Sequence, residues 1–229
     1  MDEVKKLSFR LIVRGMGTFV LFAAVLFLFA GRLSYWQGWV YFGTNVLAMI
    51  VTLFLFRNDP AFVIERQKPG PGIKSWDKVY MAFSSLFFLI SAVLGGLDAG
   101  RFHWTEPIAA GPYAAGLVFY AAGQGLFLWA KRSNRFFSSM VRIQTDRGHS
   151  VCQGGPYRWI RHPGYVGGLL YIIPAGMLLG SWLAALPQVL ASIALIIRTA
   201  LEDRTLRAEL PGYAAYAERV RWRLLPGVW

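Results

Sequence analysis

Two groups of polar residues in the last third of the chain combine residue types that could do chemistry at a membrane surface. The first group is the run 155–165, GPYRWIRHPGY, and the second is the R-x-x-x-E-D sequence that begins at Arg198. In a helix, Arg198 and Glu202 share one face because they are four residues apart, while Asp203 is turned by about 100° from Glu202. Arginine can hold an anion, and glutamate can hold an ammonium group. We therefore expect the two groups to face each other over one binding pocket.

The run 155–165 is expected to bring aromatic and basic side chains to the start of a helix. Proline is favoured in the first turn of a helix, so Pro163 predicts a helix start with His162 near the N-cap. Free backbone N–H groups there, with the positive end of the helix dipole, would suit a carboxylate or phosphate. Tyr157, Trp159 and Tyr165 add aromatic faces that can pack on an adenine ring or against a cation. In the alternative interpretation, the run holds only orientation charges and interfacial aromatic residues.

The group that begins at Arg198 also has two interpretations. It could form an exposed ion pair on a surface helix, which is worth at most about 1 kcal/mol. The group follows directly on the apolar run 182–197, however, where water is scarce and charged residues are seldom placed without a partner. We therefore assign Arg198 and Glu202 to a functional site and extend the assignment to Asp203.

Long apolar segments must position both groups. More than half of the 229 residues are hydrophobic and only 16% are charged, which is typical of a membrane protein rather than a soluble domain. A helix needs roughly 20 residues to cross the hydrocarbon core, so we predict six spans from the charge-free runs 15–30, 39–56, 79–97, 108–130, 163–180 and 182–197. Gly180 and Ser181 join the last two, which predicts a tight helical hairpin. The predicted fold is an all-α integral membrane protein with about six transmembrane helices and a C-terminal helical hairpin.

Basic residues lie almost entirely on one side of the predicted spans. Of the 24 Lys and Arg residues, 22 fall in the two termini and in the loops 57–78 and 131–162. The positive-inside rule then predicts a multi-pass protein with both termini and the catalytic segments in the cytoplasm. This orientation, together with attraction to anionic membrane lipids, explains the net charge of +12, so we predict no nucleic-acid partner. The basic and then apolar N-terminal segment is interpreted as an uncleaved signal anchor.

The cysteine and histidine content argues against a metal centre. Cys152 is the only cysteine, which excludes a disulfide within the chain and any cysteine cluster for a metal. The three histidines have no spacing to Asp or Glu that suggests a metal site, so we predict none. Cys152 lies in a basic loop that could lower the pKa of a thiol, but it has no clear base partner.

We divide the chain into two parts. Residues 1–130 hold four predicted spans, and residues 131–229 hold a polar loop, the two-span hairpin and a C-terminal segment. Because the six spans carry no charge, a transporter or channel is disfavoured, since such proteins normally have ionisable residues inside the membrane. We expect the second part to be the catalytic core, because it holds both groups of polar residues.

The order of motifs in the second part resembles the isoprenylcysteine carboxyl methyltransferase family, which is related to the phospholipid N-methyltransferases. The motifs are G-P-Y-x-x-x-R-H-P-x-Y-x-G, a hairpin, R-x-x-x-E followed by an acidic residue, G-Y-x-x-Y, and a Leu-Pro end, over about residues 134–227. The resemblance implies an integral-membrane enzyme that binds S-adenosylmethionine. Its pocket would be built from the cytoplasmic loop and the ends of the last spans.

Carried over to this sequence, the resemblance implies the site residues. Arg198 matches the arginine assigned to the methyl acceptor, and Glu202 matches an acidic residue that contacts the cofactor, so these two are the predicted catalytic residues. Gly123 and Gly125 form a G-x-G similar to that of the lipid N-methyltransferases, although glycines inside a span more often serve helix packing. The implied cofactor-binding residues are Gln144, His149, Ser150, Val151, Cys152, Tyr157, Arg161, His162, Pro163, Gly164, Tyr165, Glu202 and Asp203.

The implied reaction is direct, in-line methyl transfer to a lipophilic acceptor, such as a prenylated substrate, that enters from the bilayer. A carboxylate acceptor needs no general base at neutral pH, and the motifs are closest to the carboxyl methyltransferase branch. A lipid amine acceptor would need a base, for which His149, His162, Glu202 and Asp203 are the candidates. An NADPH-dependent membrane reductase of the sterol type is the alternative from another class. The phosphates of NADPH would require more dedicated Arg and Lys contacts.

Overall fold

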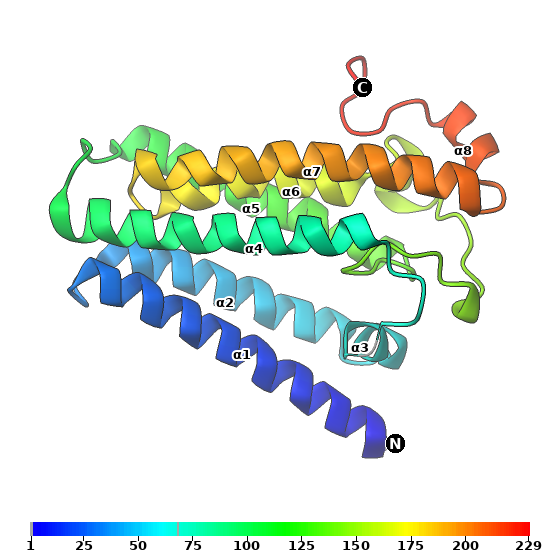
Figure 1. The fold of residues 1–229 in the computed structure, drawn as a ribbon, viewed down its shortest axis with the longest axis horizontal. Coiled ribbons are helices and arrows are strands. Elements are labelled where there is room, and N and C mark those ends of the chain that lie inside the picture. The colour runs from blue at the N-terminus through cyan, green and yellow to red at the C-terminus, as the bar shows by residue number, and fades with distance from the viewer. Residues whose placement is uncertain (1, 68) are drawn as a thin grey trace.

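Helices form an elongated bundle in this computed structural model, which describes residues 2–67 and 69–229 (Figure 1). The longer helices are α1 (Asp2–Ala30), α2 (Trp36–Phe56), α4 (Ser75–Gly95), α5 (Ala110–Ser133), α6 (Pro163–Leu178) and α7 (Trp182–Glu209). The shorter elements are α3 (Pro60–Gln67), a π-helical segment at Gly96–Phe102, single turns at Thr145–Arg147 and Gly155–Arg158, and α8 (Tyr213–Arg219). The predicted all-α class is confirmed.

Five of the helical segments are long and apolar enough to cross a membrane. They are Ile12–Ala30, Trp36–Phe56, Ser75–Phe102, Ala110–Ser133 and Trp182–Glu209. Helix α6 has only 16 residues, or about 24 Å at 1.5 Å per residue, which is less than the roughly 30 Å of a hydrocarbon core. The six predicted spans are therefore five long helices and one shorter apolar helix. Large apolar side chains exposed on the long helices, such as Leu28, Phe54 and Val118, would face lipid.

Helices α6 and α7 form the predicted hairpin. Gly180 in the turn has a φ of +72°, a backbone conformation that favours glycine. The Ser181 hydroxyl caps α7 by accepting the backbone N–H of Ala184 at 3.0 Å, and it donates to Asp98 at 2.5 Å. Helix α7 then continues without a break to Glu209, so the second arm of the hairpin itself carries the R-x-x-x-E-D group.

Helices α5 and α6 approach each other through glycines. A Cβ on Gly123 would lie 2.7 Å from the carbonyl oxygen of Gly167, and a Cβ on Gly167 would lie 2.7 Å from that of Gly123. Small residues of this kind let two helix backbones pack closely in a membrane. Gly123 therefore serves helix packing, whereas a Cβ on Gly125 would meet nothing within 4 Å. The contact holds the first turns of α6 against α5.

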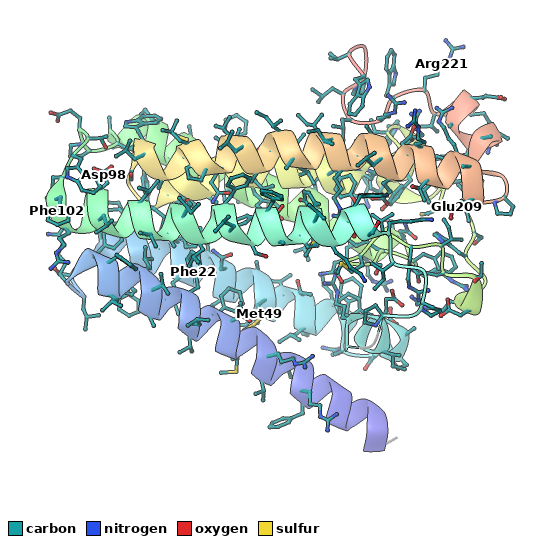
Figure 2. All side chains as sticks on the ribbon, viewed as in Figure 1. Phe22, Met49, Asp98, Phe102, Glu209 and Arg221 are labelled. Carbon is teal, nitrogen blue, oxygen red and sulfur yellow. The ribbon has the colours of Figure 1, made fainter. Side chains whose placement is uncertain are left out.

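The long loops and both ends of the chain lie at one end of the bundle, the right-hand end in Figure 1, where α3 and α8 also lie. We call it the loop end. The opposite end carries the short connections around residues 31–35 and 179–181. Figure 2 places Glu209 and Arg221 at the loop end and Asp98 and Phe102 at the opposite end. The structure thus gathers the basic loops on one side, as the charge distribution predicted.

Candidate functional site

A cavity of about 890 Å³ extends from the loop end into the bundle, between α1, α4, α6, α7 and the loop that precedes α6. One part of its wall is polar and includes His162 and Glu202, and another part is apolar and includes Leu21 and Leu89. These two leucines are also 67% and 45% exposed. The cavity therefore reaches the outer surface of the bundle between α1 and α4.

Most of the predicted cofactor-binding residues line this cavity. Those that do so are Gln144, His149, Ser150, Val151, Cys152, Tyr157, Arg161, His162, Gly164, Tyr165 and Glu202, and Arg198 joins them. Pro163 and Asp203 do not line it. Trp159, which was expected to offer an aromatic face, is 59% exposed and packs edge-on against Trp129. The run 155–165 therefore divides between the cavity and the outer surface.

Arg198 is held by an aspartate from another helix. Its Nε donates to Asp77 Oδ1 at 2.7 Å, and its Nη2 donates to Asp77 Oδ2 at 3.3 Å. The same Nη2 donates to the carbonyl oxygen of Ser139 at 3.0 Å. The guanidinium carbon lies 4.6 Å from the ring centroid of Tyr80 and 5.3 Å from that of Tyr165. Within the described chain these contacts leave Nη1 without a hydrogen-bond partner, so this nitrogen can still bind an anion.

Glu202 lies one helical turn from Arg198 and lines the same cavity, as predicted. Its Oε2 accepts a hydrogen bond from the Tyr165 hydroxyl. Within the described chain it has no ion-pair partner. A positively charged ligand would compensate the charge of this partly buried carboxylate.

Asp203 is the centre of a buried cluster behind the cavity wall. Its fully buried carboxylate accepts hydrogen bonds at 2.7–3.1 Å from Arg161, Arg207, Arg223 and Tyr213. His162 Nε2 lies 3.3 Å from the same carboxylate. The side chain predicted as a cofactor contact therefore positions Arg161 and His162, which do line the cavity.

The C-terminal segment folds back on the start of α6. The backbone N–H groups of Arg161 and His162 donate to the carbonyl oxygens of Trp222 and Arg223 at 2.9 and 3.0 Å. The Arg161 side chain adds two hydrogen bonds to main-chain carbonyls, those of Val220 and Arg221. Two of the N–H groups expected to be free near this helix start are thus used by the chain itself.

The loop between α5 and α6 is fixed by buried polar contacts. Arg142 donates to Glu65 at 2.7 and 3.1 Å and to Asp146 at 2.7 Å. The hydrogen bonds to Glu65 raise the pKa of the Arg142 guanidinium. Gln144 is buried and donates to the carbonyl oxygen of Phe136 at 2.7 Å. These contacts hold the loop against α3 and shape the cavity wall.

Two titratable groups of the cavity wall are neutral near pH 7. The Nδ1 atom of His149 accepts the backbone N–H of Gln144 at 3.2 Å. Burial, together with the nearby charges of Arg142 and Arg147, lowers the pKa of His149 to about 4. Burial also raises the pKa of the Cys152 thiol. A thiol with a raised pKa is a poor nucleophile, so the basic loop does not activate Cys152.

Asp77 is the main site residue that the sequence analysis missed. It lies in the first turn of α4, two residues before the apolar run that begins at Val79. The rule that selected Arg198, a charge placed beside a membrane span, applies equally to Asp77 and could have found it. Asp77 also accepts the backbone N–H of Val141 at 2.7 Å. It therefore joins α4, α7 and the loop before α6.

The model of the Isoprenylcysteine carboxyl methyltransferase (ICMT) family matches residues 115–208. This segment includes most of α5, the loop, α6 and nearly all of α7, with Arg198 and Glu202. The resemblance that the motifs predicted is therefore confirmed over this segment. None of the curated proteins searched matches the sequence. Among the described residues no three His, Cys, Asp or Glu side chains gather where they could hold a metal ion.

Proposed function

Residues 115–208 match the model of the isoprenylcysteine carboxyl methyltransferase family, and from this premise we propose that the chain is a membrane methyltransferase. It transfers a methyl group from S-adenosylmethionine to the carboxylate of a lipophilic, isoprenylcysteine-like acceptor. The observation that supports this proposal is one cavity that joins Glu202 and Arg198 to an apolar opening between α1 and α4. Such a cavity can receive a charged cofactor and a lipid tail together.

The residues of the polar wall fit S-adenosylmethionine. The carboxylate of Glu202 lacks a cation partner within the described chain, so it suits an ammonium or sulfonium group. Tyr157 and Tyr165 offer aromatic faces to an adenine ring or to a cation. When bound, this cofactor would supply an electrophilic methyl group.

Arg198 would orient the carboxylate of the acceptor. Asp77 and the Ser139 carbonyl hold its Nε and Nη2 atoms and leave Nη1 for a ligand. Arg198 also lies one turn nearer the apolar part of α7 than Glu202 does. An acceptor arriving from the bilayer between α1 and α4 would therefore meet Arg198 with its acidic group, while its tail stays against apolar residues.

The chain's own contribution to the reaction is alignment and exclusion of water. A carboxylate acceptor is ionised at neutral pH, so no residue has to remove a proton. The buried contact with Asp77 restricts Arg198 to one orientation. Tyr165 donates to Glu202 and also lies against the Arg198 guanidinium, so it fixes the two charged groups relative to each other.

A lipid amine acceptor is less well supported because the candidate bases are poorly placed. Asp203 is surrounded by three arginines, and His162 lies against the same carboxylate. His149 has a pKa of about 4 and is therefore a weak base. Glu202 is the remaining candidate, and a cationic cofactor would occupy it.

An NADPH-dependent reductase is also less well supported, because NADPH needs several free cations for its phosphates. In the cavity wall, Arg142, Arg161 and Arg198 already pair with Glu65, Asp203 and Asp77. Three of the four arginines that line the cavity are thus paired, which leaves fewer free cations than the phosphates of NADPH would need and favours a zwitterionic cofactor.

Binding and transfer measurements on the detergent-purified protein test this proposal. We expect saturable binding of radiolabelled S-adenosylmethionine, no specific binding of NADPH, and formation of a base-labile methyl ester on S-farnesyl-N-acetylcysteine. NADPH binding without S-adenosylmethionine binding would contradict the cofactor assignment. Methylation of phosphatidylethanolamine in place of the carboxylate acceptor would contradict the acceptor assignment.

The Glu202→Gln substitution is expected to weaken S-adenosylmethionine binding by about tenfold or more, because a charged contact in a sheltered pocket is lost. Calorimetric titration measures the effect. The matched control is Glu218→Gln, since Glu218 is an exposed glutamate on α8, and it should leave the affinity unchanged. Equal affinities of the Glu202 variant and the unmodified protein for S-adenosylmethionine would contradict the assignment of Glu202 to the cofactor site.

The proposed orientation places the loop end in the cytoplasm. A cysteine probe introduced at the exposed position Arg135 should then be labelled only from the cytoplasmic side of sealed membrane vesicles, and one at Phe102 only from the other side. The native Cys152 is replaced by serine in both proteins. The reverse pattern of labelling would invert the topology.

A further inference from the structure

One arginine of the cavity wall differs from all the others. Arg142, Arg161 and Arg198 each form an ion pair with a carboxylate. Arg66, which lies in α3 and lines the same cavity, makes no hydrogen bond or ion pair within the described chain. It is therefore the one arginine of that wall that has no ion-pair partner in the described protein. The carboxylate of Glu65 attracts the Arg66 charge without forming an ion pair with it, and Glu65 already pairs with Arg142.

The surroundings of Arg66 make this charge costly. Its Nε is buried without a hydrogen-bond partner, and its guanidinium lies over the ring of Phe62, 4.8 Å from the centroid. Burial lowers the pKa of the Arg66 guanidinium, because the charged form loses hydration. An uncompensated charge of this kind reduces stability. The burial of the Arg66 charge is explained if an anion from outside the protein pairs with the guanidinium.

A second unsatisfied polar group lies in the same cavity. The buried hydroxyl oxygen of Ser84, in α4, also has no hydrogen-bond partner. Ser84 comes one turn after Tyr80, the residue whose ring contacts Arg198. The cavity thus offers two unused donors, a guanidinium and a hydroxyl, in addition to Arg198 Nη1.

The position of Arg66 separates it from the cofactor side. Helix α3 packs against α1, the helix that provides Leu21 and Phe22 to the apolar wall. Glu202 lies on α7, next to the cluster around Asp203. The free cation and the free carboxylate of the cavity are therefore carried by different elements, which suits two ligands of opposite charge.

We propose that Arg66 is a specificity-determining residue that binds the anionic group of the lipophilic acceptor. This inference rests on the proposed function, because it names the acceptor of that site as a lipophilic anion. Arg66 and Arg198 Nη1 together would discriminate a carboxylate from a neutral head group of the same shape. Such sites reject the neutral analogue because it leaves a buried charge unpaired.

Binding of two matched probes tests this role without requiring methyl transfer. The probes are radiolabelled S-farnesyl-N-acetylcysteine and its carboxamide, and binding is measured with S-adenosylhomocysteine present. We expect the unmodified protein to bind the carboxylate at least about tenfold more tightly than the carboxamide. The Arg66→Gln variant should lose this preference, and Arg66→Lys should keep part of it because the charge remains.

Two controls separate a binding role from a structural one. Arg57→Gln removes an exposed arginine of the same loop end that does not line the cavity, and it should keep the preference. Arg66→Gln should not lower the thermal unfolding temperature, because no protein group loses a hydrogen bond or an ion pair, and removal of the buried charge offsets the lost contact with the Phe62 ring. The affinity for S-adenosylmethionine, measured on the same variants, should stay within about twofold.

The outcomes are distinct. Equal binding of both probes to the unmodified protein, or an unchanged preference in Arg66→Gln, would overturn the role of Arg66. Weaker cofactor binding in Arg66→Gln with an intact probe preference would also overturn it and would assign the guanidinium to the cofactor's own carboxylate. If the Arg66-dependent preference is present but no ester forms, the inference holds and the proposed reaction fails.

Discussion

Replacing Asp203 with alanine is expected to lower the free energy of unfolding by about 3–5 kcal/mol, which is the range for removing one partner of a buried ion pair. The Asp203 carboxylate is fully buried and accepts hydrogen bonds from three arginines. Without it, the Arg161 guanidinium, itself buried, loses its counter-charge. Arg207 and Arg223 are partly exposed, so water compensates part of their loss.

Thermal unfolding of the detergent-purified Asp203 variant measures this effect, and a fall of roughly 10 °C or more is expected for a chain of this size. The matched control is Asp146→Ala. Asp146 also pairs with a buried arginine, but it is 45% exposed, and Arg142 keeps its contacts with Glu65. The control should change the unfolding temperature little. An unfolding temperature of the Asp203 variant that equals that of the control would show that the cluster does not support the fold.

Replacing Arg198 with lysine is expected to reduce methyl transfer by roughly 10² or more while S-adenosylmethionine still binds, because misplacing the reacting groups costs rate steeply. Lysine keeps the charge but not the planar fork that now contacts both oxygens of Asp77 and still presents Nη1 to the cavity. The acceptor would therefore be held less rigidly at the position of attack.

Calorimetric cofactor titration and a transfer assay on the same preparation separate the two ligands. Arg204→Lys is the control on α7, since Arg204 is exposed and does not line the cavity. The Arg204→Lys variant should bind S-adenosylmethionine and transfer methyl groups as the unmodified protein does. Loss of cofactor affinity in Arg198→Lys with normal turnover at saturating cofactor would place Arg198 in the cofactor site instead.

Local rules predicted the parts of the fold and site that depend on neighbouring residues. Apolar run lengths marked the spans, the Gly180–Ser181 turn marked the hairpin, and helical spacing placed Arg198 and Glu202 on one wall. Helix α6 was predicted longer than it is, because an apolar run continues through the turn that ends the helix. Hydropathy alone does not distinguish the last residues of a helix from an apolar turn that follows it.

Contacts between distant segments were not predictable in the same way. Asp77 and Arg198 lie 121 positions apart, and the local sequence around either residue does not indicate that the two form an ion pair. Asp203 and Glu202 are neighbours in sequence, yet a turn of about 100° sends one into a buried cluster and the other to the cavity. Arg66 lay in a loop interpreted through its charge alone, and its lack of a partner is visible only in three dimensions.

The hydrogen bonds between residues 161–162 and 222–223 have a consequence for how the protein is made. All the long helices leave the ribosome before residues 220–223 do, so the bundle can insert and pack while the wall around Arg161 and His162 is still incomplete. Ligand binding would begin only after translation of this segment, when its carbonyl groups reach the start of α6. A nascent chain that stalls before residue 220 would therefore be membrane-inserted and inactive.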